Sequence, residues 1–133
     1  MPADILYIDS SALVKLVLPE KETVALFRLL LSWPYRLVNH IGFVEVHRAV
    51  RRASADREVL RRVEEVLSSI HFMETHMGIL GDATLLEPFH LRSLDAIHLA
   101  TAYGLRHELG AFVNDRRMAD GARSLNLKVL SPT

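Results

Sequence analysis

The sequence predicts an α/β fold in which a parallel β-sheet is covered by helices on both faces, and three observations lead to this class. Short apolar runs with the length of a buried strand alternate with longer segments whose apolar residues recur at helical spacing. Half of the 133 residues are hydrophobic and 24% are charged, which excludes a disordered chain. No repeat, low-complexity tract or flexible linker interrupts the alternation, so we expect one domain over residues 1–133.

The first half of the chain contains two predicted strands and four predicted helices. The apolar residues 5–8 form the first strand, and the helix that begins at Ser10 ends before Pro19, because proline cannot continue a helix. Residues 21–32 carry a wide apolar stripe at helical spacing, which is broken after residue 32 by a Trp-Pro pair. A strand at residues 36–39, a helix at 41–53 and a highly charged helix at 56–69 follow.

The second half contains three predicted strands separated by helices. β-Branched and aromatic residues predict a strand at residues 70–74, and a helix at 77–86 is stopped by Pro88. A long and almost wholly apolar helix covers residues 93–108. Gly110 separates it from a strand at 111–113, and a short helix at 116–124 and a strand at 127–130 complete the chain.

The composition excludes several functional classes. With 16 basic and 16 acidic residues the chain is not a polycation, although a local basic strip remains compatible with this balance. The absence of cysteine excludes a disulfide scaffold, a thiolate zinc site and a cysteine nucleophile, so a metal ion would need oxygen or imidazole ligands. No apolar run has the length of a membrane span, and Asp4 and Asp9 flank the first apolar run, unlike a signal peptide. We therefore expect a cytoplasmic protein.

Two acidic residues follow predicted strands. Asp9 comes directly after the first strand, and Asp115 follows Val113 and Asn114 at the end of the fourth. Ligands bind at the carboxyl ends of strands in open parallel sheets, so both residues are candidates for a functional site. Either one could instead cap the N-terminus of the helix that comes next.

Two further acidic residues lie in apolar parts of predicted helices. Nearly every neighbour of Asp95 is apolar, and a buried carboxylate is costly unless it is paired or bound to a metal ion. The alternative is compensation of the helix dipole, with Ser93 as the cap. Glu45 could form an ordinary ion pair with Arg48, three residues further on.

The four carboxylates share one location in the predicted fold, because two follow strands and two lie on helices that cover the same sheet edge. Gathered without a cation, they would repel one another and raise each other's pKa values. A divalent cation removes this conflict, and oxygen ligands favour Mg²⁺ or Mn²⁺. Among the seven histidines, none forms a zinc-type pair on one helix, and His98 is expected to be a satisfied core histidine.

Around these acids the sequence resembles the PIN-domain ribonucleases, and more closely the VapC-type toxins of prokaryotic toxin–antitoxin pairs. Residues 7–16 (YIDSSALVKL) resemble the first motif of the family, and Glu45 matches the acidic position of its third helix. Residues 94–102 (LDAIHLATA) resemble the third-acid motif and are the most specific match, whereas residues 114–119 (NDRRMA) resemble the fourth. The resemblance extends over essentially the whole chain.

This resemblance implies a three-layer α/β/α sandwich with a five-stranded parallel sheet of order 3-2-1-4-5. Asp9, Glu45, Asp95 and Asp115 would hold one or two Mg²⁺ or Mn²⁺ ions, and Ser11 would form a hydrogen bond near the first acid. The sequence departs from the family at Val113, where Thr or Ser is common, which affects a supporting hydrogen bond but none of the four acids.

The resemblance also implies an activity and partners. The protein would be an endoribonuclease that hydrolyses RNA phosphodiester bonds with a water molecule activated by the metal, and a cognate antitoxin would inhibit it. A homodimer is implied as well. Asn114, Arg48 and Arg116 are candidates for contacts with the RNA substrate or for support of the acids.

A catalytically silent PIN-like module that binds RNA or protein is the alternative from another class. Such a module would be insensitive to Asp9→Asn or Asp95→Asn. Apolar residues 29–31 together with Trp33 belong either to the core or to a docking surface for a second subunit or an antitoxin. Other phosphate chemistry is disfavoured, because the sequence has no P-loop or dinucleotide motif and Ser11 stands where a haloacid-dehalogenase-like phosphatase needs an aspartate.

Overall fold

The computed structural model describes residues 3–88, 90–114 and 118–130. In this part of the chain one parallel sheet has the order β3-β2-β1-β4-β5, which confirms the predicted fold class. Each strand after β1 follows a crossover through helices, as parallel neighbours require. The strands are β1 (Ile5–Ile8), β2 (Tyr35–Asn39), β3 (His71–Met73), β4 (Leu109–Val113) and β5 (Val129–Leu130).

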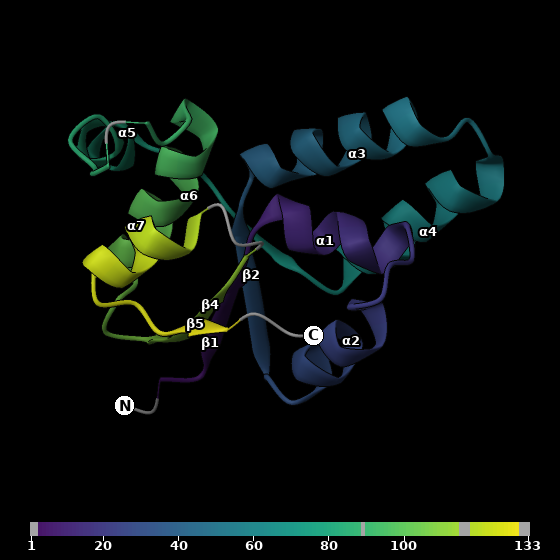
Figure 1. The fold of residues 1–133 in the computed structure, drawn as a ribbon, viewed down its shortest axis with the longest axis horizontal. Coiled ribbons are helices and arrows are strands. Elements are labelled where there is room, and N and C mark those ends of the chain that lie inside the picture. Colours follow the sequence, from purple (N-terminus) through teal and green to yellow (C-terminus); the bar gives the residue numbers. More distant parts are fainter. Residues whose placement is uncertain (1–2, 89, 115–117, 131–133) are drawn as a thin grey trace.

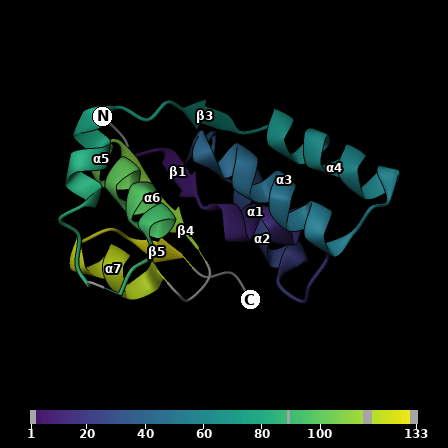
Figure 2. The ribbon, with the colours of Figure 1, turned by 90° about the horizontal axis from the view of Figure 1, so that it is seen from above.

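Helices cover both faces of this sheet and give the three layers that the sequence predicts. Figures 1 and 2 show α1 to α4 on one side of the sheet and α5 to α7 on the other. The first group consists of α1 (Ser10–Val17), α2 (Thr23–Leu31), α3 (Ile41–Ala53) and α4 (Arg57–Ser68). The second group consists of α5 (Met77–Ala83), α6 (Ser93–Gly104) and α7 (Ala119–Ser124).

The central strand β1 is buried on both faces, as its continuous apolar sequence predicts. Leu6, Tyr7 and Ile8 are fully buried, and the ring of Tyr7 stacks on Phe112 of β4 with the ring centroids 5.2 Å apart. Because β1 pairs with β2 on one side and with β4 on the other, the chain reverses its direction of sheet growth at β1. The carboxyl end of β1 is therefore the switch point at which such sheets bind ligands.

The junction between α6 and β4 differs from the sequence prediction. The helix ends at Gly104, not at residue 108, and β4 begins at Leu109, two residues earlier than predicted. Glycine is a poor helix former, and the turn that follows allows the buried Leu109 to pair with Ile5. Gly110 lies inside β4, at a shift in the register with β1, and does not precede the strand.

The remaining boundaries differ by a few residues, as is common for element ends. The fourth helix is capped by Asp56, and the short strands β3 and β5 span less than the predicted 70–74 and 127–130. Helix α5 ends at Ala83, three residues before its predicted end, and α7 begins at Ala119, whereas residues 115–117 lie outside the described residues. None of the helices in the described residues has the length and apolar character needed to cross a membrane.

Candidate active site

Asp9 lies at the carboxyl end of β1 and is 1% exposed. It is the N-cap of α1, because its Oδ1 accepts a hydrogen bond from the backbone N–H of Ala12 at 3.1 Å. The hydroxyl of Ser11 lies 2.8 and 2.9 Å from the two carboxylate oxygens of Asp9. The capping interpretation therefore holds, and it is compatible with a functional role because the same contacts fix the carboxylate at the switch point.

Asp95 lies in the first turn of α6 and is 4% exposed. Its helix is buried along most of its length, which agrees with the apolar surroundings in the sequence. In the alternative explanation of Asp95, the cap at Ser93 is wrong: Ser93 is the first helical residue, Arg92 occupies the capping position, and no side chain caps the helix. Asp95 shares a helical face with His98, one turn further along α6.

Glu45 lies on α3 and is engaged with a histidine. Its Oε1 is 2.6 Å from Nε2 of His98, and its side chain is 21% exposed. The alternative of an ion pair with Arg48 is not found among the described residues, because the Glu45 carboxylate is directed to His98 of α6. Helices α3 and α6 lie on opposite faces of the sheet, so this contact joins the two helical layers at the sheet edge (Figure 2).

Behind Glu45, His98 belongs to a buried polar network. Its Nδ1 lies 2.6 Å from the hydroxyl of Tyr7, and this hydroxyl accepts a hydrogen bond from the backbone N–H of Asn39 at 3.0 Å. Burial, together with the negative charges of Asp9 and Glu45, raises the pKa of Tyr7 well above its ordinary value. The phenol is therefore a neutral hydrogen-bonding group at physiological pH.

A cavity of about 420 Å³ is lined by one of the three described acids, Glu45, and by residues next to the other two. Ser10 and Ser11 follow Asp9 directly, Leu94 precedes Asp95 directly, and Glu45 itself lines the wall. The cavity also carries three arginines, Arg48 and Arg52 from α3 and Arg92 from the segment before α6. The complete lining is Ser10, Ser11, Val14, Val44, Glu45, Arg48, Ala49, Arg52, Arg92 and Leu94.

The fourth predicted acid, Asp115, and the predicted substrate contact Arg116 lie outside the described residues. Asn114, which precedes them, is 5% exposed, and neither polar atom of its amide has a hydrogen-bond partner within the described part of the chain. Asn114 and Val113 line a small cavity of about 20 Å³ beside Lys15. This space suits a single water molecule that could satisfy the amide.

The donor set at this edge suits a hard divalent cation. Asp9 and Asp95 are buried carboxylates, and Asp9 and Glu45 both lie close enough to Tyr7 for their charges to act on its hydroxyl. Oxygen-rich sites of this kind favour Mg²⁺ or Mn²⁺. However, no three His, Asp or Glu side chains among the described residues are arranged so that they could already bind one metal ion together.

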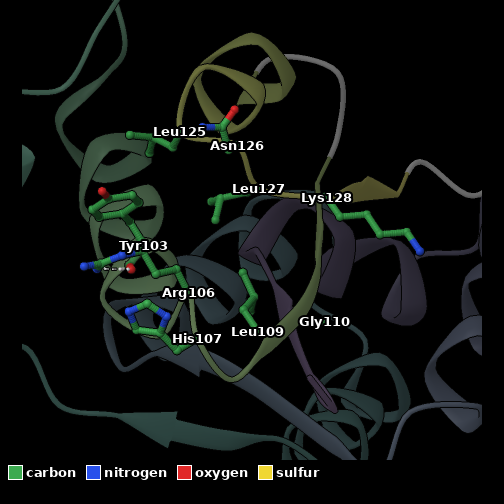
Figure 3. A pocket seen from close by; sticks show the side chains of 9 residues that line it. All are labelled: Tyr103, Arg106, His107, Leu109, Gly110, Leu125, Asn126, Leu127 and Lys128. Carbon is green, nitrogen blue, oxygen red and sulfur yellow. Dashed lines mark hydrogen bonds between the residues drawn. The ribbon is translucent and has the colours of Figure 1, made fainter. Parts of the chain in front are cut away.

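A second cavity of about 370 Å³ lies at the opposite edge of the sheet, between the end of α6, the start of β4 and the segment before β5. Its charged side chains do not converge on one point. Arg106 lies over the ring of Tyr103 and donates a hydrogen bond to the carbonyl of Tyr103, whereas Lys128 extends away from both (Figure 3). We therefore assign no site to this cavity.

Comparison with known proteins places the chain in a family. The family model described as PIN domain matches residues 6–124. The chain is 38% identical over 130 residues to ribonuclease VapC46 of Mycobacterium tuberculosis (strain ATCC 25618 / H37Rv), which covers 96% of this chain and 98% of the relative. It is 34% identical over 132 residues to ribonuclease VapC47 of M. tuberculosis (strain CDC 1551 / Oshkosh), covering 96% of each.

Solved structures with low sequence identity share the fold. The crystal structure of VapBC2 from Rickettsia felis bound to a promoter DNA fragment has a TM-score of 0.75 at 11% identity, covering 97% of this chain and 99% of that chain. A toxin–antitoxin complex from Klebsiella pneumoniae has a TM-score of 0.68 at 23% identity, covering 96% and 98%.

The chain therefore belongs to the PIN-domain family, and within it to the VapC ribonucleases, which confirms the resemblance of its motifs. PIN-domain ribonucleases depend on divalent metal ions. Sequence reasoning named the candidate acids but missed the partner of Glu45. The available signal was the spacing of three residues between Asp95 and His98, which puts both on one helical face.

Proposed function

We propose that this protein is a metal-dependent endoribonuclease of VapC type that hydrolyses RNA phosphodiester bonds. The observation that carries the proposal is a cavity lined by the Glu45 carboxylate and by three arginines, next to the positions of the buried carboxylates of Asp9 and Asp95. Carboxylates alone would repel RNA, and arginines alone would bind it without chemistry. Their combination at the switch point supports a site that holds a cation and a phosphate together.

Asp9, Glu45, Asp95 and Asp115 would hold the metal ion, Mg²⁺ or Mn²⁺. When bound, the ion would supply positive charge that offsets the charge developing on the phosphate oxygens and would lower the pKa of a water molecule for attack on phosphorus. Ser11 fixes the Asp9 carboxylate through its hydroxyl, and the helix-capping bond restricts the same carboxylate further. These contacts preorganise the acid before the ion binds, which reduces the cost of assembling the site.

Arg48, Arg52 and Arg92 would bind the phosphates that flank the scissile bond. Arg48 and Arg52 are one turn apart on α3, and Arg92 lines the same cavity from the segment before α6. Cationic side chains on two walls would guide a single RNA strand across the acids. Asn114 and Arg116 remain proposed contacts because they flank Asp115.

A cognate antitoxin and a second copy of the chain are the proposed protein partners. The related structures include toxin–antitoxin complexes. Helix α2 exposes large apolar side chains, with Val24, Phe27 and Leu31 at 62%, 45% and 79% exposure, and such side chains favour a protein contact. A cytoplasmic location, where RNA is available, belongs to the same proposal.

The test is incubation of the purified protein with a mixed pool of tRNA and mRNA in Mg²⁺, in Mn²⁺ and in EDTA. We expect discrete fragments in at least one metal and none in EDTA. Intact RNA under all conditions, at high protein concentration and with folding verified by circular dichroism, would contradict the proposal. That outcome would favour the catalytically silent binding module.

A further inference from the structure

A continuous chain of hydrogen bonds runs from the sheet to Glu45 through groups that ribonuclease chemistry does not itself require. It starts at the backbone N–H of Asn39, which donates to the hydroxyl of Tyr7 at 3.0 Å. The Tyr7 hydroxyl is 2.6 Å from Nδ1 of His98, and Nε2 of His98 is 2.6 Å from Oε1 of Glu45. Tyr7 and His98 are at most 1% exposed, so water does not compete for these bonds.

The directions of these bonds follow from the groups at the ends of the chain. The backbone N–H of Asn39 can only donate, so the Tyr7 oxygen accepts from it. The neutral phenol also lies beside the hydroxyl of Thr101, whose own proton is donated to the carbonyl of Ile97. We assign the phenol proton to Nδ1 of His98 at 2.6 Å, which then accepts. The remaining ring proton lies on Nε2 and is donated to the Glu45 carboxylate. The backbone of β2 thereby selects one tautomer of His98.

We propose that His98 is a positioning residue for the metal centre: Tyr7 fixes its Nε2–H tautomer, and the Nε2–H group holds Oε1 of Glu45 at the cavity wall. The inference rests on the proposed metal-dependent function. Oε2 of Glu45 makes no hydrogen bond within the described residues and belongs to a side chain that lines the cavity, so it stays available for the cation. A histidine that orients a ligand carboxylate sharpens metal affinity without touching the metal.

The packing of α3 supports this role. Gly42 lies one turn before Glu45, and a Cβ there would come 2.9 Å from Cγ2 of Val38 and 3.8 Å from Cε1 of His98. Glycine thus lets the first turn of α3 approach the sheet end and the imidazole closely. The flexible Glu45 side chain would otherwise sample several rotamers, and the bond to a buried imidazole restricts it to one position.

Mn²⁺ affinity of the full-length protein, measured by calorimetry, tests the inference. Asparagine cannot reach Glu45 from position 98, whereas the longer glutamine can present an N–H near the position of Nε2. We expect His98→Asn to weaken Mn²⁺ binding about 10- to 100-fold, the usual cost of losing a residue that orients a metal ligand. His98→Gln should retain most of the affinity, and the exposed His107→Asn serves as the matched control.

A double-mutant cycle separates positioning from a general effect on the core. If His98 acts through Glu45, then His98→Asn causes no further loss of Mn²⁺ affinity in a Glu45→Gln background. Equal losses in both backgrounds would overturn the inference. Wild-type protein that binds no Mn²⁺ would contradict the proposed function as well, whereas equal affinities of wild type and His98→Asn would overturn this inference alone.

Nitrogen NMR of the metal-free wild-type protein tests the tautomer directly, and variants serve only for assignment and as a control. In protein labelled with ¹⁵N-histidine, the signals missing from His98→Gln identify the ring nitrogens of His98. We expect a protonated Nε2 and an unprotonated Nδ1, and loss of this single tautomer in Tyr7→Phe. A protonated Nδ1 in the wild type would overturn the proposed chain of bonds.

Discussion

The backbone N–H of Asp9 donates a hydrogen bond to the carbonyl of Val113 at 3.0 Å, which joins the carboxyl ends of β1 and β4. The register pairs Ile8 with Val113, so the residues that follow the two strands emerge side by side. This bond uses the backbone of Asp9 and leaves its carboxylate to the cap and to Ser11. The switch point is therefore held by main-chain contacts that substitutions of the acid leave intact.

Asp9→Asn should preserve the fold but weaken metal binding. Asparagine caps helices as well as aspartate does, so we expect little change in the melting temperature. Loss of a residue that only orients a ligand costs about 10- to 100-fold in metal affinity, so loss of a ligand should cost at least about 100-fold. Asp56→Asn, which changes the cap of α4 in the same way, is the control for Mn²⁺ calorimetry. Equal affinities of both variants would exclude Asp9 as a ligand.

Arg52→Ala should weaken RNA binding more than Arg51→Ala. The two arginines are neighbours on α3. Of the two, Arg52 is among the residues that line the cavity and Arg51 is not. Each lost phosphate contact should reduce the dependence of log affinity on log salt concentration by about 0.7 for a single strand. Filter binding across a salt series, in EDTA to prevent cleavage, measures this slope. An unchanged slope for Arg52→Ala, or the same decrease for both variants, contradicts the proposed phosphate contact of Arg52 in the cavity.

Alkaline pH should destabilise the protein through Tyr7. Burial raises the pKa of this phenol, and the charges of Asp9 and Glu45 raise it further. In the unfolded chain the phenol loses its proton near pH 10, whereas the folded protein keeps it, so stability is complete below about pH 10 and falls as the pH rises above it. One proton corresponds to about 1.4 kcal/mol per pH unit in this range.

Urea unfolding between pH 9 and 11.5 measures this effect by comparison with Tyr7→Phe. The variant keeps the ring that stacks on Phe112 but has no phenol to ionise, so its stability should decrease less steeply above pH 10. If the free energy of unfolding falls with pH at the same rate in both proteins, then Tyr7 ionises in the folded state near its ordinary pKa.

Gly110→Ala should destabilise the fold. A Cβ at this position would lie 2.2 Å from the ring of Trp33 and 2.4 Å from the carbonyl of Ala3, and neither neighbour is a flexible side-chain end. Overpacking of this kind costs about 1–3 kcal/mol. Gly81→Ala on α5 is the control, because its Cβ would meet nothing within 4 Å and helix propensity favours alanine. Urea denaturation that gives equal stabilities for the two variants would contradict the close packing of Trp33.

The arrangement of layers and the three described acids could be predicted because their causes are local in the sequence. An acid after an apolar strand, such as Asp9, and an acid within an apolar helix, such as Asp95, are visible without knowledge of tertiary contacts. The strand order came from the family resemblance, because periodicity alone does not order strands. Gly110 illustrates the limit at boundaries, since its place inside β4 follows from the pairing of Leu109 with Ile5, a contact between distant parts of the chain.

The partner of Glu45 could not be predicted from local sequence. Spacing along α3 favoured Arg48, whereas the observed partner His98 lies 53 residues away on α6. This choice depends on how closely two helices from opposite layers meet at the sheet edge. Arg48 instead lines the cavity, where its charge is available for another ligand.

The most direct test of the account is recovery of RNA cleavage when Mn²⁺ is titrated into protein stripped with EDTA. We predict no cleavage in the stripped protein, recovery in the wild type, and no recovery in Asp95→Asn. Asp120→Asn is the matched control, because Asp120 also lies in the first turn of a helix but is exposed, and it should recover like the wild type. Cleavage that persists in the stripped protein, or full recovery in folded Asp95→Asn, would contradict a metal centre built on these acids.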